Sequence, residues 1–112
     1  MIPVTTTFAF EGYRIVEYKG IVRGITVRAL SAVGGFTGSL QSIFGGQIDS
    51  YTRMCEQARQ QAYDLLVQHA REMGANAVVG LRYDATEVVQ GSSEVLCYGT
   101  AVVIEPLAPS AR

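Results

Sequence analysis

The sequence is poor in charge. Only 17% of its 112 residues are Asp, Glu, Lys or Arg, and the formal net charge is −1. A balance so close to neutrality gives no electrostatic attraction for nucleic acid or an anionic membrane, so we expect neither as a partner. Long apolar runs are missing too, because no stretch reaches the roughly 18 residues that a membrane-spanning helix needs. Residues 1–5 lack the basic and apolar blocks of a signal peptide, and we therefore expect a cytoplasmic protein.

Cysteine is scarce as well. The two thiols, Cys55 and Cys97, have no CxxC spacing, and a free cysteine behaves as a small hydrophobic residue. Together with the single histidine, His69, they are the candidate ligands for a heavy metal, the one cofactor that the sequence raises. On one helix His69 would lie about 21 Å beyond Cys55, so these two side chains cannot share an ion within one subunit. Cys97 could approach either of them, or its own copies around a symmetry axis.

Apolar residues, in contrast, are abundant. They make up 48% of the chain, and the mean hydropathy is +0.19. A domain of this length buries only roughly 65% of its unfolded surface, so one subunit is left with apolar surface that it cannot cover. A subunit interface is the simplest way to bury that surplus, and the expected partner is another copy of the same chain.

The spacing of apolar residues predicts the secondary structure. Steps of three and four over Ile48–Met73 predict one long amphipathic helix, ended by Gly74. Its apolar stripe includes Cys55 and Leu65 and crosses a whole sheet. Glycines surround a short amphipathic piece at Thr37–Phe44, where we expect a short helix. Alternating patterns predict three strands: Tyr13–Leu30 (bulged near Gly20 or Gly24), Ala77–Val88 and Glu94–Ile104. The β-branched and aromatic residues of the N-terminal segment predict a further short strand at Val4–Thr6.

This order, β-β-short α-long α-β-β, predicts an α+β fold in two layers, with an antiparallel sheet packed on one long helix. Residues 1–106 form a single domain in this interpretation, and residues 107–112 form a C-terminal tail. Both faces of the last predicted strand are apolar, so one face is left for something other than the helix to cover.

Four segments together resemble the YbjQ-like family, whose members are described as heavy-metal-binding. They are Gly20–Gly24 (GIVRG), Ser42–Tyr51 (SIFGGQIDSY), Gly74–Asp84 (GANAVVGLRYD) and Glu94–Val102 (EVLCYGTAV). The resemblance implies a subunit similar to that of dodecin and a homopentameric assembly, and no catalytic activity is established for the family. Members often carry an arginine after the paired glycines and an acid after the helix-start tyrosine, where this chain has Gln47 and Thr52.

A ligand or anion site is a further hypothesis. Gly45, Gly46 and Gln47 precede or open the long helix, whose N-terminus favours an anion, and Arg82 could add positive charge. Neither the P-loop pattern nor GxGxxG is present, and glycines that serve only as turn residues explain the same pattern.

No Ser–His–acid order surrounds the single histidine, and we do not expect an enzyme. The sequence therefore predicts a homo-oligomeric binding or structural protein, with five copies as the expected number. Two alternatives stay open. The chain could bind a heavy metal through its cysteine thiols, or it could carry a small ligand between subunits with the help of its glycine-rich loop and tyrosines.

Overall fold

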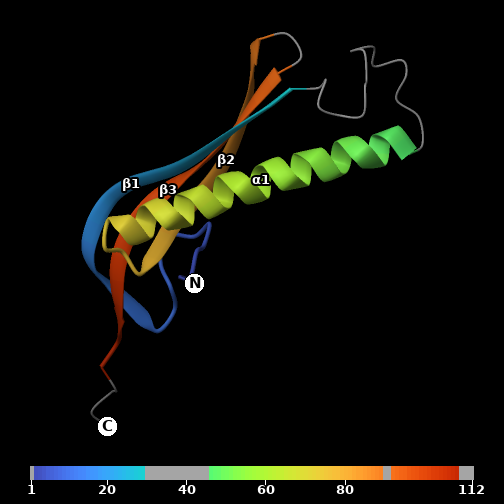
Figure 1. The fold of residues 1–112 in the computed structure, drawn as a ribbon. Coiled ribbons are helices and arrows are strands. Elements are labelled where there is room, and N and C mark those ends of the chain that lie inside the picture. Colours follow the sequence, from blue (N-terminus) through green and yellow to red (C-terminus); the bar gives the residue numbers. More distant parts are fainter. Residues whose placement is uncertain (1, 30–45, 90–91, 109–112) are drawn as a thin grey trace.

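The computed structural model describes residues 2–29, 46–89 and 92–108. This part of the chain contains three strands and a helix in the order β1 (Tyr13–Ala29), α1 (Gly46–Glu72), β2 (Ala77–Val89) and β3 (Ser92–Pro106). The strands form an antiparallel sheet in the order β1-β3-β2, and α1 lies across one face of it (Figure 1). The predicted α+β fold with two layers is therefore confirmed.

Several element boundaries differ from the prediction. The helix begins at Gly46 and ends at Glu72, so it starts and stops slightly earlier than the apolar spacing indicated. The segment Val4–Thr6 is not a strand of the sheet, because it forms a single parallel bridge, between Val4 and Val78. The short helix predicted over Thr37–Phe44 lies outside the described residues.

The end of α1 is set by a glycine, as predicted. Gly74 has a φ of 85°, a conformation that costs a glycine little, and its N–H donates to the carbonyl of Arg71 at 2.9 Å. The next N–H, of Ala75, donates to the carbonyl of Ala70 at 3.0 Å, which completes a Schellman motif. Asn76 then ties the turn to β3, because its side chain exchanges hydrogen bonds of 2.8 and 3.0 Å with the backbone of Ile104.

The helix packs on the sheet through small residues. Its buried stripe advances in steps of four, and one glycine of β1, Gly24, lies directly beneath it. A side chain on Gly24 would collide with the carbonyl of Ala62 and would stand only 2.8 Å from the backbone nitrogen of Leu66. Leu65 and Cys55, which the predicted stripe included, are instead exposed. The helix residues that are buried on the sheet are Ala58, Ala62, Leu66, Val67 and Ala70.

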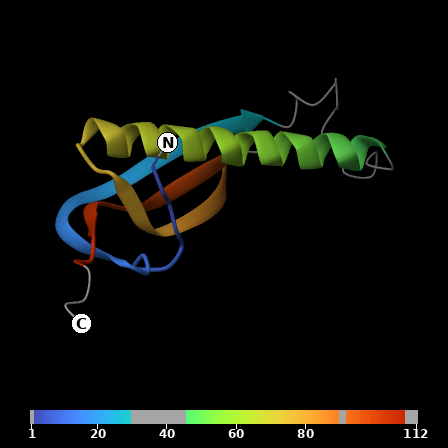
Figure 2. The same cartoon turned by 90° about the horizontal axis from the view of Figure 1, so that it is seen from below.

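The second half of α1 alone is packed in this way. None of the described side chains of residues 49–57 is buried, and this part of the helix extends beyond the sheet (Figures 1 and 2). The prediction that the apolar stripe crosses the whole sheet was therefore wrong for the first half of α1. No helix in the described ranges combines the length and the apolar character that crossing a membrane requires.

The N-terminal segment covers the outer edge of β2 near its start. Backbone hydrogen bonds of 2.8 to 3.1 Å join residues 3–7 to Val78, Gly80 and Leu81. Figure 2 shows residues 2–12 passing β2 and turning beneath the sheet towards β1. Phe10 and Ile15 then pack against Val79 and Ile104 on the face away from α1, so the chain shields this end of the sheet with its own residues.

Candidate functional site

The three candidate metal ligands lie apart from one another. Cys55 is exposed on the projecting half of α1, whereas Cys97 is fully buried in β3 beneath the helix. His69 is half-buried near the other end of α1. In the parts of the chain that the structure describes, no three His, Cys, Asp or Glu side chains gather closely enough to hold an ion. The subunit alone does not bring the predicted ligands together.

The Cys97 thiol has the chemistry of a core residue. Burial raises its pKa from 9.0 to about 11, and a hydrogen bond from Tyr83 opposes part of that rise. Burial also raises the pKa of Tyr83 from 10.0 to about 12, and the neighbouring thiol adds to the effect. Because the thiolate is the nucleophile, Cys97 is poorly suited to nucleophilic chemistry near neutral pH.

Tyr83 also contacts α1, in an arrangement that the sequence did not reveal. The Arg59 guanidinium lies 5.5 Å from the centre of the Tyr83 ring, which is a cation–π distance. Apolar periodicity could not have found this contact, because it joins a polar helix position to a strand more than twenty residues later.

The candidate anion residue Arg82 is engaged by the N-terminal segment. Its guanidinium donates to the carbonyls of Thr6 at 3.0 Å and Leu81 at 2.8 Å, and it lies 5.7 Å from the centre of the Phe8 ring. Gly80 makes room for that ring, since an added Cβ would approach it to 3.0 Å. The structure therefore supports a positioning role for Arg82, which fixes residues 6–8 on β2.

The other residues of the predicted anion site lie elsewhere. Gly46 begins α1, at the end of the helix that projects away from the sheet, and Gln47 follows it. Gly45 is outside the described residues. Arg82 is therefore not brought together with the start of α1, and the predicted combination of Arg82 with that helix end does not form within one subunit.

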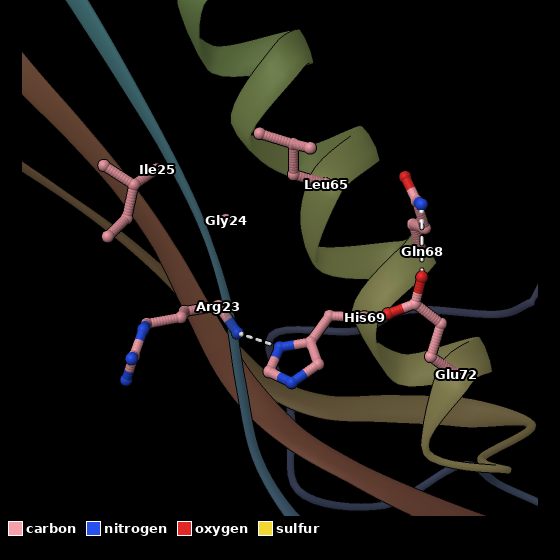
Figure 3. Close-up of a pocket in the computed structure, with 7 residues that line it drawn as sticks. All are labelled: Arg23, Gly24, Ile25, Leu65, Gln68, His69 and Glu72. Atoms are coloured by element: carbon pink, nitrogen blue, oxygen red, sulfur yellow. Dashed lines mark hydrogen bonds between the residues drawn. The ribbon is translucent and has the colours of Figure 1, made fainter.

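A hollow lies where α1 overhangs the outer edge of β1. It has a volume of about 340 Å³, and a second hollow of about 410 Å³ shares Ile25 and Leu65 with it. We call the two together the edge groove. At one end the backbone N–H of Arg23 donates to Nδ1 of His69 at 3.4 Å, while the guanidinium of Arg23 points away from the helix (Figure 3). The edge groove is lined by Arg23, Gly24, Ile25, Thr26, Gln61, Asp64, Leu65, Gln68, His69 and Glu72.

The sheet face away from α1 carries exposed apolar side chains. In β3, Val95, Cys97 and Ala101 belong to the core under α1, so the alternate residues point to the other face. The register pairs Ile21 with Thr100 and Ile25 with Leu96, which places both isoleucines on that other face. Ile21 is 72% exposed and Val27 is 58% exposed. We call this surface the open face; its exposed apolar residues are Tyr18, Ile21, Ile25, Val27 and Tyr98.

Comparison with known proteins identifies the family. The model of the YbjQ family, described as "Putative heavy-metal-binding", matches residues 1–105. The chain belongs to the YbjQ family. The expected resemblance is confirmed.

Two bacterial relatives of this YbjQ-family chain are named as UPF0145 proteins, a name that specifies no enzyme. The one from Chromobacterium violaceum is 60% identical over 105 residues, which cover 94% of this chain and 90% of the relative. The one from Burkholderia thailandensis is 57% identical over 99 residues, covering 88% of this chain and 89% of the relative.

A solved structure shares the fold of this YbjQ-family chain. It is a Pediococcus pentosaceus protein of unknown function from the DUF74 family. The TM-score is 0.63 at 22% sequence identity, and the match covers 93% of this chain and 98% of the other. At this identity the likeness shows the fold alone.

Proposed function

We propose that the chain works as a self-assembling binding or structural protein, and that five copies form the assembly. The observation that carries the proposal is the open face. Its residues Ile21, Val27 and Tyr18 are 72%, 58% and 69% exposed, and all three lie on the same face of β1. Large apolar side chains gathered on one exposed face mark an interface more often than scattered ones do. The number five rests on the family resemblance and not on the apolar surface.

The first half of α1 supports the same proposal. Helices in proteins draw most of their stability from packing an apolar face against other parts of the structure. Residues 46–57 continue α1 without a buried side chain among those described, so contacts with another copy would stabilise them. An assembly would thus cover both the open face and the projecting half of the helix.

Native mass spectrometry of protein purified without an affinity tag tests this proposal. Five chains of 12.1 kDa would give a particle of about 60 kDa. A mass of 12.1 kDa at micromolar concentration would overturn the proposal. The same spectrum would reveal a small molecule retained between subunits, which is the outcome expected of a ligand carrier.

A matched pair of variants locates the interface. Ile21→Lys places a charge on the open face, and we expect it to shift the mass towards single chains. Glu11→Lys changes charge in the exposed turn before β1 and should leave the mass of the assembly unchanged.

Heavy-metal binding is the second candidate, and the description of the family favours it. Because Cys55, Cys97 and His69 lie apart within one subunit, an ion would need ligands from more than one copy. Elemental analysis of the same tag-free protein tests this candidate. Less than about a tenth of an ion per chain would exclude a tightly held metal, and Cys55→Ala should halve any real stoichiometry or abolish it.

A further inference from the structure

The outer edge of β1 offers backbone groups for another strand. Arg23 donates its N–H outward, to His69, so this N–H points away from β3. Backbone groups of alternate residues point to the same side of a strand, and therefore the N–H groups of Ile25 and Val27 also point outward. Arg23 and Ile25 line the edge groove, where α1 overhangs the strand (Figure 3).

The second half of β2 has an outer edge of the same kind. Leu81 donates outward to Thr5, so the N–H groups of Tyr83 and Ala85 also point outward. Within the described residues, the backbone bonds from the N-terminal segment reach β2 only at Val78–Leu81. Ala85 donates to the carboxylate of its own neighbour Asp84 at 3.0 Å, as Arg23 donates to a side chain on β1.

Charge decides which edges fit together. The segment Arg23–Ala29 contains two arginines and no acid, whereas Tyr83–Val89 contains Asp84 and Glu87 and no base. Pairing β1 with β1, or β2 with β2, would bring like charges together, which destabilises a sheet. Pairing the unlike edges brings opposite charges together. Since β1 and β2 are both antiparallel to β3, rotation about a ring axis makes that joint parallel.

The direction of the side chains then limits the register. In a parallel pair, a residue whose backbone N–H and C=O point to the other strand bonds to the two residues that flank its neighbour there. The outward N–H groups of β2 belong to the odd-numbered residues Tyr83 and Ala85. Arg23 must therefore lie beside an even-numbered residue of β2. Arg23 and Asp84 share the open face, as their β3 partners Tyr98 and Leu96 show. Within one subunit Arg23 and Arg82 lie level, because both pair with Tyr98. If the next copy joined at that same level, Arg23 would face Arg82 of the partner subunit. A shift of two residues along the strand places Arg23 opposite Asp84 of the partner subunit instead. A closed sheet requires a stagger.

We propose that Tyr83–Val89 of one copy adds as a parallel strand to Arg23–Ala29 of the next, with Arg23 facing Asp84 of the partner subunit. This inference rests on the proposed assembly and names its interface. In that joint Ile25 lies beside Thr86 of the partner subunit, and the carbonyl of Arg23 accepts from Ala85 of the partner subunit. The contact is heterologous, so it generates a ring when the rotation closes.

Charge reversal tests the joint. Arg23→Glu and Asp84→Arg should each raise the concentration needed for assembly on the order of tenfold, and the double variant should recover most of that loss. Arg71→Glu, an exposed change of the same charge on α1, should have no effect on assembly. An assembly that is insensitive to both single reversals, or a double variant no better than either, overturns the joint.

Cross-linking tests the register and remains informative if a charge variant fails to fold. In a Cys55→Ser background, Ile25→Cys with Thr86→Cys should form disulfides on oxidation, because neighbouring strands hold their Cα atoms within disulfide range at about 4.8 Å. A denaturing gel should show a ladder that extends beyond the dimer.

Ile25→Cys alone should not cross-link. Dimers from that single variant, or an assembled double variant that gives no ladder, would overturn the proposed joint. A wild-type protein that is monomeric by native mass spectrometry would instead overturn the proposed function, so the two failures are distinguishable.

Discussion

The two ends of the sheet are finished differently. Where β2 begins, residues 2–12 cover its outer edge and the face away from α1, and Ala77, Val79 and Val102 are almost fully buried. Towards the opposite end, Ile21 and Val27 remain exposed, and the first half of α1 extends past the sheet (Figure 1). A single chain therefore covers its sheet at one end and leaves apolar side chains exposed towards the other.

The largest contrast should come from two aspartates placed on opposite faces. Leu81 is 7% exposed under α1, so Leu81→Asp buries an unpaired charge and should cost more than about 4 kcal/mol of the free energy of unfolding. Tyr98 is 37% exposed on the open face, so Tyr98→Asp should fold and lose only assembly. Circular dichroism and native mass spectrometry separate the two effects. A folded, assembled Leu81→Asp protein would contradict the assignment of the core.

The contact between α1 and β1 should be the next most sensitive. Gly24→Ala places a methyl group against the backbone of Ala62 and Leu66, and the helix must move away. We expect a loss of about 2 kcal/mol of unfolding free energy, as for other overpacked contacts, measured by urea denaturation. Gly12→Ala is the control for steric space, since an added Cβ there meets nothing within 4 Å, although its φ of 84° carries a backbone cost of its own.

The N-terminal segment should contribute less. Arg82→Met keeps the aliphatic stem but removes two hydrogen bonds to backbone carbonyls and the contact with Phe8. Because the site is exposed, we expect a loss of about 1 kcal/mol, together with faster hydrogen exchange at Gly80 and Leu81. Unchanged exchange at both amides would show that Arg82 does not fix the segment.

The smallest effect should be a pH dependence of the unfolding free energy that arises from the buried thiol of Cys97. The folded state holds the Cys97 proton more tightly than the unfolded chain, since its pKa is raised from 9.0 to about 11. The unfolded chain therefore loses this proton first, and the resulting stability is present below pH 9 and is lost as the pH rises towards 11. Urea denaturation at pH 8, 9 and 10 should show falling stability. Cys97→Ala should flatten that slope, and Cys55→Ala should not.

The sequence was a good guide wherever one chain supplies all the contacts. Alternation predicted β1, β2 and β3 closely, and Gly74 predicted the end of α1 because few other residues accept its φ of 85°. It was a poorer guide to the helix stripe, where Leu65 was expected to be buried. Hydrophobicity alone cannot show that Gly24 lets the helix backbone at Ala62 and Leu66 approach β1, or that Leu65 is exposed.

The candidate site was less predictable for a physical reason. Residue type identified Cys55, Cys97 and His69 as ligands, but only the fold shows that they lie apart and that Cys97 is buried. At the edge groove, the backbone N–H of Arg23 donates to the ring of His69 and so links β1 to α1. Every residue except proline has a backbone N–H, so the sequence cannot show which one makes such a bond. The composition showed that the chain has more apolar residues than one subunit can bury. Only the strand register shows that the exposed ones gather on the open face.

The turn at Gly74–Asn76 has a mechanical consequence. Its hydrogen bonds to Ala70, Arg71 and Ile104 fix the angle at which α1 leaves β2. The helix acts as a lever about 40 Å long, so a change of about five degrees at this elbow would move its free end by roughly 3.5 Å. Residues 74–76 thus determine where the first half of α1 lies. Substitutions there would change the geometry of an assembled ring even though these residues make no contact in the proposed joint between subunits.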